Sequence, residues 1–399
     1  MLTQAKPSDL RSHVPFDADR LDRLMDEAGL HVLVATSKHN VQYLLGGHRA
    51  LFFDYMDAMG VSRYLPVFVY VKGAVDKAAY FGHRLEGYQR EVKPFWVATA
   101  QTGSSGSVDA MQKAIDHIRG LGLRLRRIGA EVAFLPLDAG MALRGAFPDV
   151  EIVDALVVLE RQRARKNAEE LEKLRIASDR VIDSMMAVVA NHGPGTTKLE
   201  LTEALRREET NRGLTFEYCL IAAGASHNRA PSEQKWEDGE VLSLDSGGNY
   251  HGYIGDVARM AILGEPDTEL NELLAEIEQV QQAAFRSVRA GAMGGDIYAA
   301  AAEPLVRHSR QHNHLHFLAH GMGLVSHEAP RLTNSGPVPY TDDDAHRPLE
   351  AGMVISVETT LLHPRRGFIK LEDTVAVTEA GYDVYGDRAR GWLRGGSAL

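Results

Sequence analysis

Four acidic residues of this 399-residue chain lie within apolar, β-branched segments of its second half, a strand context to which acidic side chains are poorly suited. Asp245 and Asp256 flank the turn-like segment GGNYHG. If this hairpin turns midway, between Tyr250 and His251, the two aspartates face each other across the ladder. Their Cβ atoms are then roughly 5 Å apart on the same face.

A second predicted hairpin repeats this arrangement. Its strands, MVISVETTLLH and FIKLEDTVAV, are joined by PRRG, which centres the turn near Arg365. Glu358 then lies opposite Glu372. Like charges this close repel each other, burial raises the cost, and a bound cation removes the problem. Acidic positions that face water would explain one such hairpin, but two together favour a metal site.

A histidine-rich segment between His308 and His327 supplies a fifth ligand. His320 stands in His-Gly-Met-Gly, where small neighbours allow an imidazole to approach a metal closely. Four carboxylates and one imidazole suit Mn²⁺, Fe²⁺, Co²⁺ or Zn²⁺, and not a thiolate-type structural zinc site. Two ions about 3.5–4 Å apart can activate a shared water and polarise a carbonyl, so we expect hydrolysis of an amide-like bond. The predicted metal ligands are Asp245, Asp256, His320, Glu358 and Glu372.

The elements that must position these residues fall into two predicted domains, because the chain is too long for one ordinary core. The first part alternates helical segments, such as Asp17–Ala28, with short apolar strands, which predicts an α/β domain over residues 1–160. A charged segment at 159–170 marks the boundary. Long helices, the first over about 168–191, then precede the acidic hairpins, which predicts an α+β domain over 161–399.

Composition excludes several classes of protein. The formal net charge of −10 argues against a nucleic-acid-binding surface and against a basic membrane-binding patch. The single cysteine, Cys219, excludes an intramolecular disulfide and fits a reducing compartment. We find no signal peptide and no apolar run of membrane-spanning length. These features predict a cytoplasmic protein without nucleic-acid or membrane partners.

The segments around these residues resemble the M24 metallopeptidase family, whose pita-bread fold is shared by prolidase, aminopeptidase P, methionine aminopeptidase and creatinase. LSLDSGGNYHGYIGDVAR resembles the segment with the two aspartates, HFLAHGMGLVSHEAPRL the His-Gly-x-Gly segment, and GMVISVET and IKLEDTVAVTEAG the glutamate segments. Upstream, HNVQYLLGG resembles a motif of the creatinase-like N-terminal domain. The resemblance implies an α/β creatinase-like domain followed by an α+β pita-bread catalytic domain, assembled as a homodimer.

The resemblance also implies a role for each metal ligand. Asp245 and Glu372 would bridge two divalent ions. Asp256 would bind one of these ions, and His320 and Glu358 would bind the other. Glu358 would also act as the general acid–base for the bridging water.

Three further residues would contact the substrate according to the same resemblance. His327 would hydrogen-bond the substrate carbonyl or the developing oxyanion. His316 would line the substrate pocket. Arg331 would grip a substrate carboxylate. The short gap between the two glutamates fits the prolidase-like branch of the family.

Two positions depart from the family pattern, and we interpret both as substrate-binding positions. Asn228 stands where the peptidases carry a histidine, and an amide can hold a substrate but cannot shuttle protons. His227 is next to it, but neighbours on an extended chain face opposite ways. Lys370 stands where arginine is usual, which keeps the charge but loses the bidentate fork. Neutral drift explains both departures, and so does a changed substrate.

Three functions therefore remain open. The first is an Xaa-Pro dipeptidase or aminopeptidase with two metal ions. The second is a metal-dependent hydrolase or lyase of a small non-peptide metabolite, like ectoine hydrolase or the dimethylsulfoniopropionate lyase of this fold. The third is a non-catalytic binding module, which the full ligand set disfavours. The aromatic segment at 51–64 either covers the pocket of a neighbouring subunit or packs in a dimer.

Overall fold

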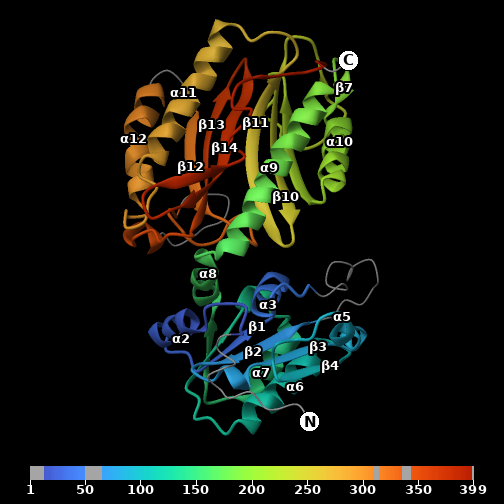
Figure 1. Cartoon of the computed structure of the whole chain (residues 1–399), viewed down its shortest axis with the longest axis vertical. Helices are drawn as coiled ribbons and strands as arrows, with labels where there is room; N and C mark the ends of the chain where they lie inside the picture. The colour runs from blue at the N-terminus through green and yellow to red at the C-terminus, as the bar shows by residue number, and fades with distance from the viewer. Residues whose placement is uncertain (1–12, 50–64, 310–313, 335–342, 398–399) are drawn as a thin grey trace. The chain divides into compact units, whose positions relative to one another are not determined.

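The computed structural model describes residues 13–49, 65–309, 314–334 and 343–397, so the aromatic segment at 51–64 lies outside the described residues. The chain divides into two compact units, Met1–Gln162 and Arg163–Leu399 (Figure 1). Among the described residues, no helix is long and apolar enough to cross a membrane.

The first unit is built on a six-stranded mixed sheet. The strand order is β4 (Thr99–Ser104), β3 (Ala79–His83), β2 (Val67–Val71), β1 (Val32–Ala35), β5 (Arg127–Ala130), β6 (Glu151–Asp154). The helices are α2 (Ala18–Glu27), α3 (Lys38–Leu44), α5 (Gln89–Val92), α6 (Ser107–Gly120), α7 (Leu137–Ala146) and α8 (Leu156–Ala164), which continues past Gln162. Short 3₁₀ turns are η2 (Val75–Lys77), η3 (Arg84–Glu86) and η4 (Val132–Phe134). Apolar residues of β1, β2, α6 and α7 form its core, which agrees with the predicted α/β alternation.

The second unit is built on an eight-stranded sheet. Its main strand order is β12 (Leu315–Gly321), β13 (Val354–His363), β14 (Gly367–Val377), β11 (Tyr253–Ile262), β10 (Val241–Tyr250), β8 (Thr215–Ala223). At its margins, β15 (Tyr382–Tyr385) pairs with β14, and β16 (Leu393–Arg394) pairs with β11. A separate small sheet pairs β7 (Thr196–Thr197) with β9 (Lys235–Trp236). The helices are α9 (Ala168–Ala190), α10 (Lys198–Asn211), α11 (Thr268–Phe285) and α12 (Asp296–Ser309), with a 3₁₀ turn, η5 (Asp343–His346).

Helix starts follow side-chain capping that the sequence already carries. Asn167 caps α9, and Glu170 three residues later completes a capping box. Thr197 and Glu200 form the same box at the start of α10. The structure therefore begins the two helices at Ala168 and Lys198, and the first of these agrees with the predicted start near residue 168.

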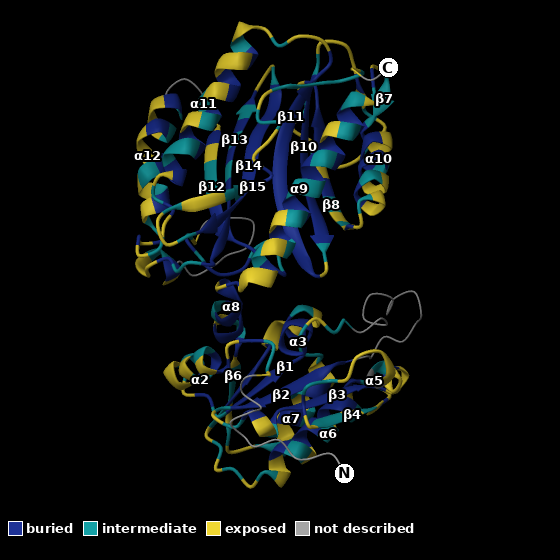
Figure 2. Cartoon of the chain, in the orientation of Figure 1, coloured by how far each residue is buried: buried dark blue, intermediate teal, exposed yellow. Residues whose placement is uncertain are grey.

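The helices cover one face of the second sheet and leave the other face to the acidic residues. The cores beneath α9 and α11 include Leu244 and Val357. Asp245 and Glu358 are the next residues on the same strands, so their side chains point to the opposite face. Figure 2 shows that the central strands are buried along most of their length, whereas the helices alternate buried and exposed turns.

The two hairpins differ in how closely they follow the predicted register. Glu358 pairs with Glu372, as predicted. Asp245, however, pairs with Ala258, and Asp256 pairs with Gly247, so the predicted pairing of the aspartates is wrong. The turn residues are His251 and Gly252, with φ of 51° and 98°, and two positive φ angles are typical of a type I′ hairpin turn.

This turn lies one residue further along the chain than the predicted midpoint. The shift changes each pairing by two residues, and an even shift keeps side chains on the same face of the sheet. Asp245 and Asp256 therefore remain on one face as diagonal neighbours instead of directly opposed ones. The predicted convergence of the two aspartates survives the error in register.

A buried carboxyl group lies on the helix-covered side of β10. Glu209 of α10 is fully buried, and its Oε1 accepts a 2.9 Å hydrogen bond from Ser246 Oγ. Its Oε2 has no hydrogen-bond partner among the described residues. Burial, together with the neighbouring charge of Glu217, raises the pKa of Glu209 to about 8.

Because this folded-state pKa lies above the unfolded value, Glu209 stabilises the fold at low pH and loses that contribution as pH rises through about 8. Glu209→Gln should therefore raise the free energy of unfolding at pH 9 by on the order of 4 kcal/mol, and by only about 1 kcal/mol at pH 5. Denaturant titrations at both values measure this, with the exposed Glu272→Gln as control. An equal effect at both pH values would contradict the prediction.

Candidate metal centre

The five predicted metal ligands come from five different strands of the second sheet. They are Asp245 on β10, Asp256 on β11, His320 on β12, Glu358 on β13 and Glu372 on β14. Five adjacent strands of one sheet thus bring together residues that are up to 127 positions apart in the sequence (372 − 245).

Strand pairing places three of the carboxylates in one row across the sheet. Glu358 pairs with Glu372, Glu372 pairs with Ala258, and Ala258 pairs with Asp245. Paired residues point to the same face of a sheet. The row therefore presents three carboxylates, with the small side chain of Ala258 between two of them.

His320 and Asp256 belong to the neighbouring positions on the same face. His320 pairs with Ser356, which is two residues from Glu358 along β13. Asp256 is two residues from Ala258 along β11. Because side chains alternate along a strand, a step of two residues keeps both groups on the face of the carboxylate row.

Three of these residues form a group with the spacing of metal ligands. Asp256, His320 and Glu372 each offer one ligand atom within 4.8 Å of the others, and all three are buried. Asp256 Oδ1 and His320 Nε2 have no hydrogen-bond partner among the described residues, and unpaired buried polar atoms are costly. The group therefore fits a cation. The resemblance placed Asp256 and His320 on different ions, whereas this group brings them together.

The electrostatics of the site fit a cation as well. Burial raises the pKa of Asp256 well above its usual value, and the charges of Glu372 and Asp245 raise it further. Burial lowers the pKa of His320 to about 4, so its imidazole is neutral. His320 Nδ1 lies 3.2 Å from the Gly321 carbonyl, which can only accept, so Nδ1 donates. The lone pair is then on Nε2, the atom that faces the cluster without a partner.

His327 lies directly against this imidazole. Its ring stacks on the ring of His320 with centroids 3.8 Å apart and planes inclined by 11°. Burial, together with the neighbouring His320, lowers the pKa of His327 to about 4. The half-buried ring is therefore neutral and adjoins the metal-binding group, and its contact with a substrate carbonyl stays a prediction.

Lys370 lies among the carboxylates, where the sequence placed a substrate-binding residue. Its Nζ is 2.6 Å from Asp245 Oδ2 and 2.7 Å from Glu372 Oε2, and it also pairs with Glu358 Oε2. Only 5% of its side chain is exposed. Burial opposes the charge, but Asp245, Glu372 and Glu358 together raise the pKa of Lys370 well above its usual value. The ammonium group thus belongs to the carboxylate cluster.

Sequence reasoning missed Arg229. Its guanidinium pairs with Asp245 Oδ2 and lies over the ring of Phe368, 4.7 Å from the centroid. Its one signal in the sequence was its position beside Asn228. The side chain of Asn228 itself is exposed and accepts a 2.9 Å bond from the backbone of Ala230.

The other predicted substrate contacts lie on nearby segments. His316 is exposed on β12, four residues before His320, on the same face of the strand. Arg331 is half-buried, and its backbone N–H donates to Asp344 Oδ2 at 2.8 Å. Their roles toward a substrate stay predictions.

A buried ion cluster holds the segment that carries His327. Arg163 Nη2 is 2.8 Å and Lys166 Nζ is 3.2 Å from the carboxylate of Glu328, and all three residues are buried. The backbone N–H of Glu328 also donates to the Gly321 carbonyl at 2.9 Å. Glu328 therefore fixes the segment from both its side chain and its backbone, and this holds His327 against His320.

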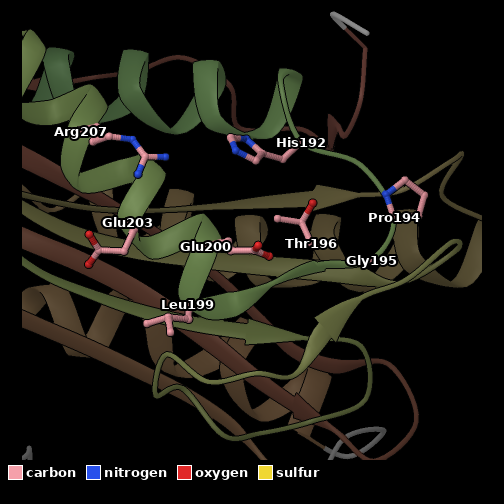
Figure 3. A pocket seen from close by; sticks show the side chains of 8 residues that line it. All are labelled: His192, Pro194, Gly195, Thr196, Leu199, Glu200, Glu203 and Arg207. Atoms are coloured by element: carbon pink, nitrogen blue, oxygen red, sulfur yellow. The ribbon is translucent and has the colours of Figure 1, made fainter.

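One hollow of the second unit lies away from this group of residues. It encloses about 670 Å³ beside the start of α10, and Figure 3 shows its lining residues. Two of its acidic side chains already have partners. Glu200 accepts from the backbone of Thr197, and Glu203 pairs with Arg206. The hollow contains none of the predicted site residues, so we do not assign the chemistry to it.

Glu328→Gln removes the carboxylate charge that faces Arg163 and Lys166. Breaking a buried pair in this way should lower the free energy of unfolding by about 3–5 kcal/mol. The matched control is Glu303→Gln, which removes an exposed partner of Arg307 and should cost less than about 1 kcal/mol. Urea unfolding measures both, and equal losses would contradict a structural role for Glu328.

Comparison with known protein families gives a match for each of the two units. Residues 169–379 match the sequence model of Metallopeptidase family M24, and residues 18–165 match that of the Creatinase/Prolidase N-terminal domain. These matches confirm the predicted fold class of a creatinase-like domain followed by a catalytic domain of this family.

Among curated relatives, a probable dipeptidase PepE of Mycobacterium tuberculosis is 26% identical over 367 residues, which cover 89% of each chain. An Xaa-Pro dipeptidase of Pyrococcus furiosus is 26% identical over 230 residues, covering 56% of this chain and 63% of that protein. Among solved structures, an Xaa-Pro dipeptidase from Bacillus anthracis has a TM-score of 0.77 at 22% identity, covering 94% of this chain and 98% of that one. This structural likeness shows the shared fold.

Proposed function

The chain belongs to metallopeptidase family M24 and is a metal-dependent hydrolase, and we propose that it acts as a dipeptidase or aminopeptidase at Xaa-Pro bonds. The observation that carries the proposal is the convergence of all five predicted ligands on one face of the sheet, next to His327. The names of the relatives, dipeptidase and Xaa-Pro dipeptidase, support a dipeptide substrate. A homodimer in the cytoplasm is part of the proposal, on the basis of the family resemblance and the single cysteine.

In this proposal, Asp256, His320 and Glu372 hold a divalent cation. A cation bound there lowers the pKa of a water molecule and polarises a carbonyl. The metal can be Mn²⁺, Co²⁺, Fe²⁺ or Zn²⁺, because all of these accept carboxylate and imidazole ligands.

Glu358 and His327 carry out the proton and hydrogen-bond steps. Glu358 is the least buried of the three carboxylates in the row, with 13% of its side chain exposed, so it can contact an attacking water. It takes the proton of that water and passes it to the leaving nitrogen. The neutral ring of His327 donates a hydrogen bond to the oxygen of the substrate carbonyl as negative charge develops there.

Three further residues are proposed to contact the ends of the substrate. Arg331 is the candidate to bind a dipeptide carboxylate, since a guanidinium and a carboxylate form a bidentate pair. Asn228 and His316 are the candidates to line the pocket. The competing function, hydrolysis or lysis of a small non-peptide metabolite, is motivated by Asn228 and Lys370, which depart from the peptidase pattern.

A panel of Xaa-Pro dipeptides, incubated with protein loaded with each of the four metals, tests the proposal. We expect release of the N-terminal amino acid. Glu358→Gln should lower kcat by about 10²–10⁴-fold, because it removes the proton carrier while keeping the side-chain shape. His327→Ala should lower kcat by about 10²–10³-fold.

The exposed Glu303→Gln serves as the control and should retain full activity. Turnover of ectoine-type or betaine-type compounds, with no amino acid released from any dipeptide, would replace the peptidase with the metabolite hydrolase or lyase.

A further inference from the structure

We propose that the ammonium group of Lys370 takes the place of one of the two expected ions, so that the chain holds a single divalent ion on Asp256, His320 and Glu372. This inference rests on the metal dependence stated above and defines the centre more closely. The resemblance predicts two ions, and a measurement of metal stoichiometry decides between the two numbers.

The first argument is the position of the ammonium group. Lys370 is two residues before Glu372 on β14, so both side chains point to the ligand face. Its Nζ approaches Asp245 and Glu372 at 2.6 and 2.7 Å and also contacts Glu358. An ammonium group has three donors and no acceptor, and three carboxylates lie within ion-pair distance of this one. The positive charge next to the carboxylate row is therefore part of the protein chain itself.

The second argument is the division of the ligand atoms into two sets. Asp245 and Glu358 point at Lys370, and Asp245 also pairs with Arg229. Asp256 Oδ1 and His320 Nε2, by contrast, have no hydrogen-bond partner among the described residues. Glu372 is shared, because its Oε1 accepts from Ser356 at 2.6 Å and its Oε2 lies near Lys370 without an aligned hydrogen bond. The carboxylates of Asp245 and Glu358 are thus neutralised by Lys370, whereas Asp256 Oδ1 and His320 Nε2 remain available to bind a cation.

The third argument is charge balance. The site contains four carboxylates, from Asp245, Asp256, Glu358 and Glu372. Lys370 and Arg229 supply two positive charges, both in contact with Asp245. One divalent ion then brings the sum to zero (−4 + 2 + 2), whereas two ions would leave an excess of two positive charges. Excess charge in a buried site is costly, because little solvent screens it.

The arginine usual at this position in the peptidases would act differently. Its charge is spread over a planar fork that suits one carboxylate in a bidentate pair. The compact ammonium group of lysine can instead sit between several oxygens, as a small ion does. The substitution of lysine for arginine therefore changes which positions remain open to metal.

Metal stoichiometry tests the proposal without reference to any substrate. The full-length protein is saturated with Mn²⁺ or Co²⁺, freed of loosely bound ion by gel filtration, and analysed by elemental mass spectrometry. We expect one ion per chain. Lys370→Met removes the charge at nearly constant volume and frees the carboxylates of Asp245 and Glu358. This variant should bind two ions per chain, a twofold rise.

Electron paramagnetic resonance of the Mn²⁺-loaded proteins gives a second readout. Two neighbouring ions broaden and couple their spectra, so coupling should be absent in the unsubstituted protein and present in Lys370→Met. Lys198→Met is the matched control, because Lys198 is a buried lysine of the same unit whose Nζ donates to the Asn228 carbonyl instead of to a carboxylate. It should bind one ion, without coupling.

Two ions in the unsubstituted protein would overturn the inference, and so would one ion in a folded Lys370→Met variant. If Lys370→Met does not fold, the stoichiometry of the unsubstituted protein alone decides the question. The proposed function fails separately. One bound ion without activity on any Xaa-Pro dipeptide would reject the proposed substrate and leave the single ion standing. Two ions together with dipeptidase activity would reject the single ion and leave the proposed substrate standing.

Discussion

The catalytic unit depends on neutralising four carboxylates on one face of a β-sheet, three of which are buried. Like charges at this spacing repel, and loss of water makes the repulsion stronger. Asp245, Asp256 and Glu372 are each at most 2% exposed, so solvent screens them little. Positive charge inside the fold must compensate them. Lys370 and the metal-binding group divide this task, and the surrounding structure holds both in position.

Register is the second requirement, because the ligands belong to five neighbouring strands. A slip of one residue in any pairing would turn that strand's ligand toward the helices. The far face resists such a slip. Gly255, next to Asp256, lies so close to α9 that an added Cβ would meet the backbone of Ser178 at 2.4 Å. The helices thus contribute to the metal centre indirectly, by fixing the strands from behind.

The sequence predicted the parts of this architecture that local patterns determine. Apolar periodicity located α9, and symmetric spacing paired Glu358 with Glu372 correctly. The pairing of the aspartates was missed by two residues, because the left-handed backbone at His251 and Gly252 is decided by the turn and not by the midpoint of the segment. The contacts of Lys370 with Asp245 and Glu358, and of Arg229 with Asp245, were beyond prediction. These partners lie on other strands or distant segments, and spacing along the chain does not report such contacts.

The difference between a lysine and an ion has a consequence for the stability of the site. An ion stabilises a fold only while it is bound, and its contribution falls with the concentration of free metal. Lys370 is present in every folded chain, so Asp245 and Glu358 keep their compensating charge whether or not metal is available. A centre with one fixed and one exchangeable cation therefore confines the effect of metal loss to Asp256, His320 and Glu372. The carboxylate row would keep its geometry through that loss, which leaves the sheet ready to take up metal again.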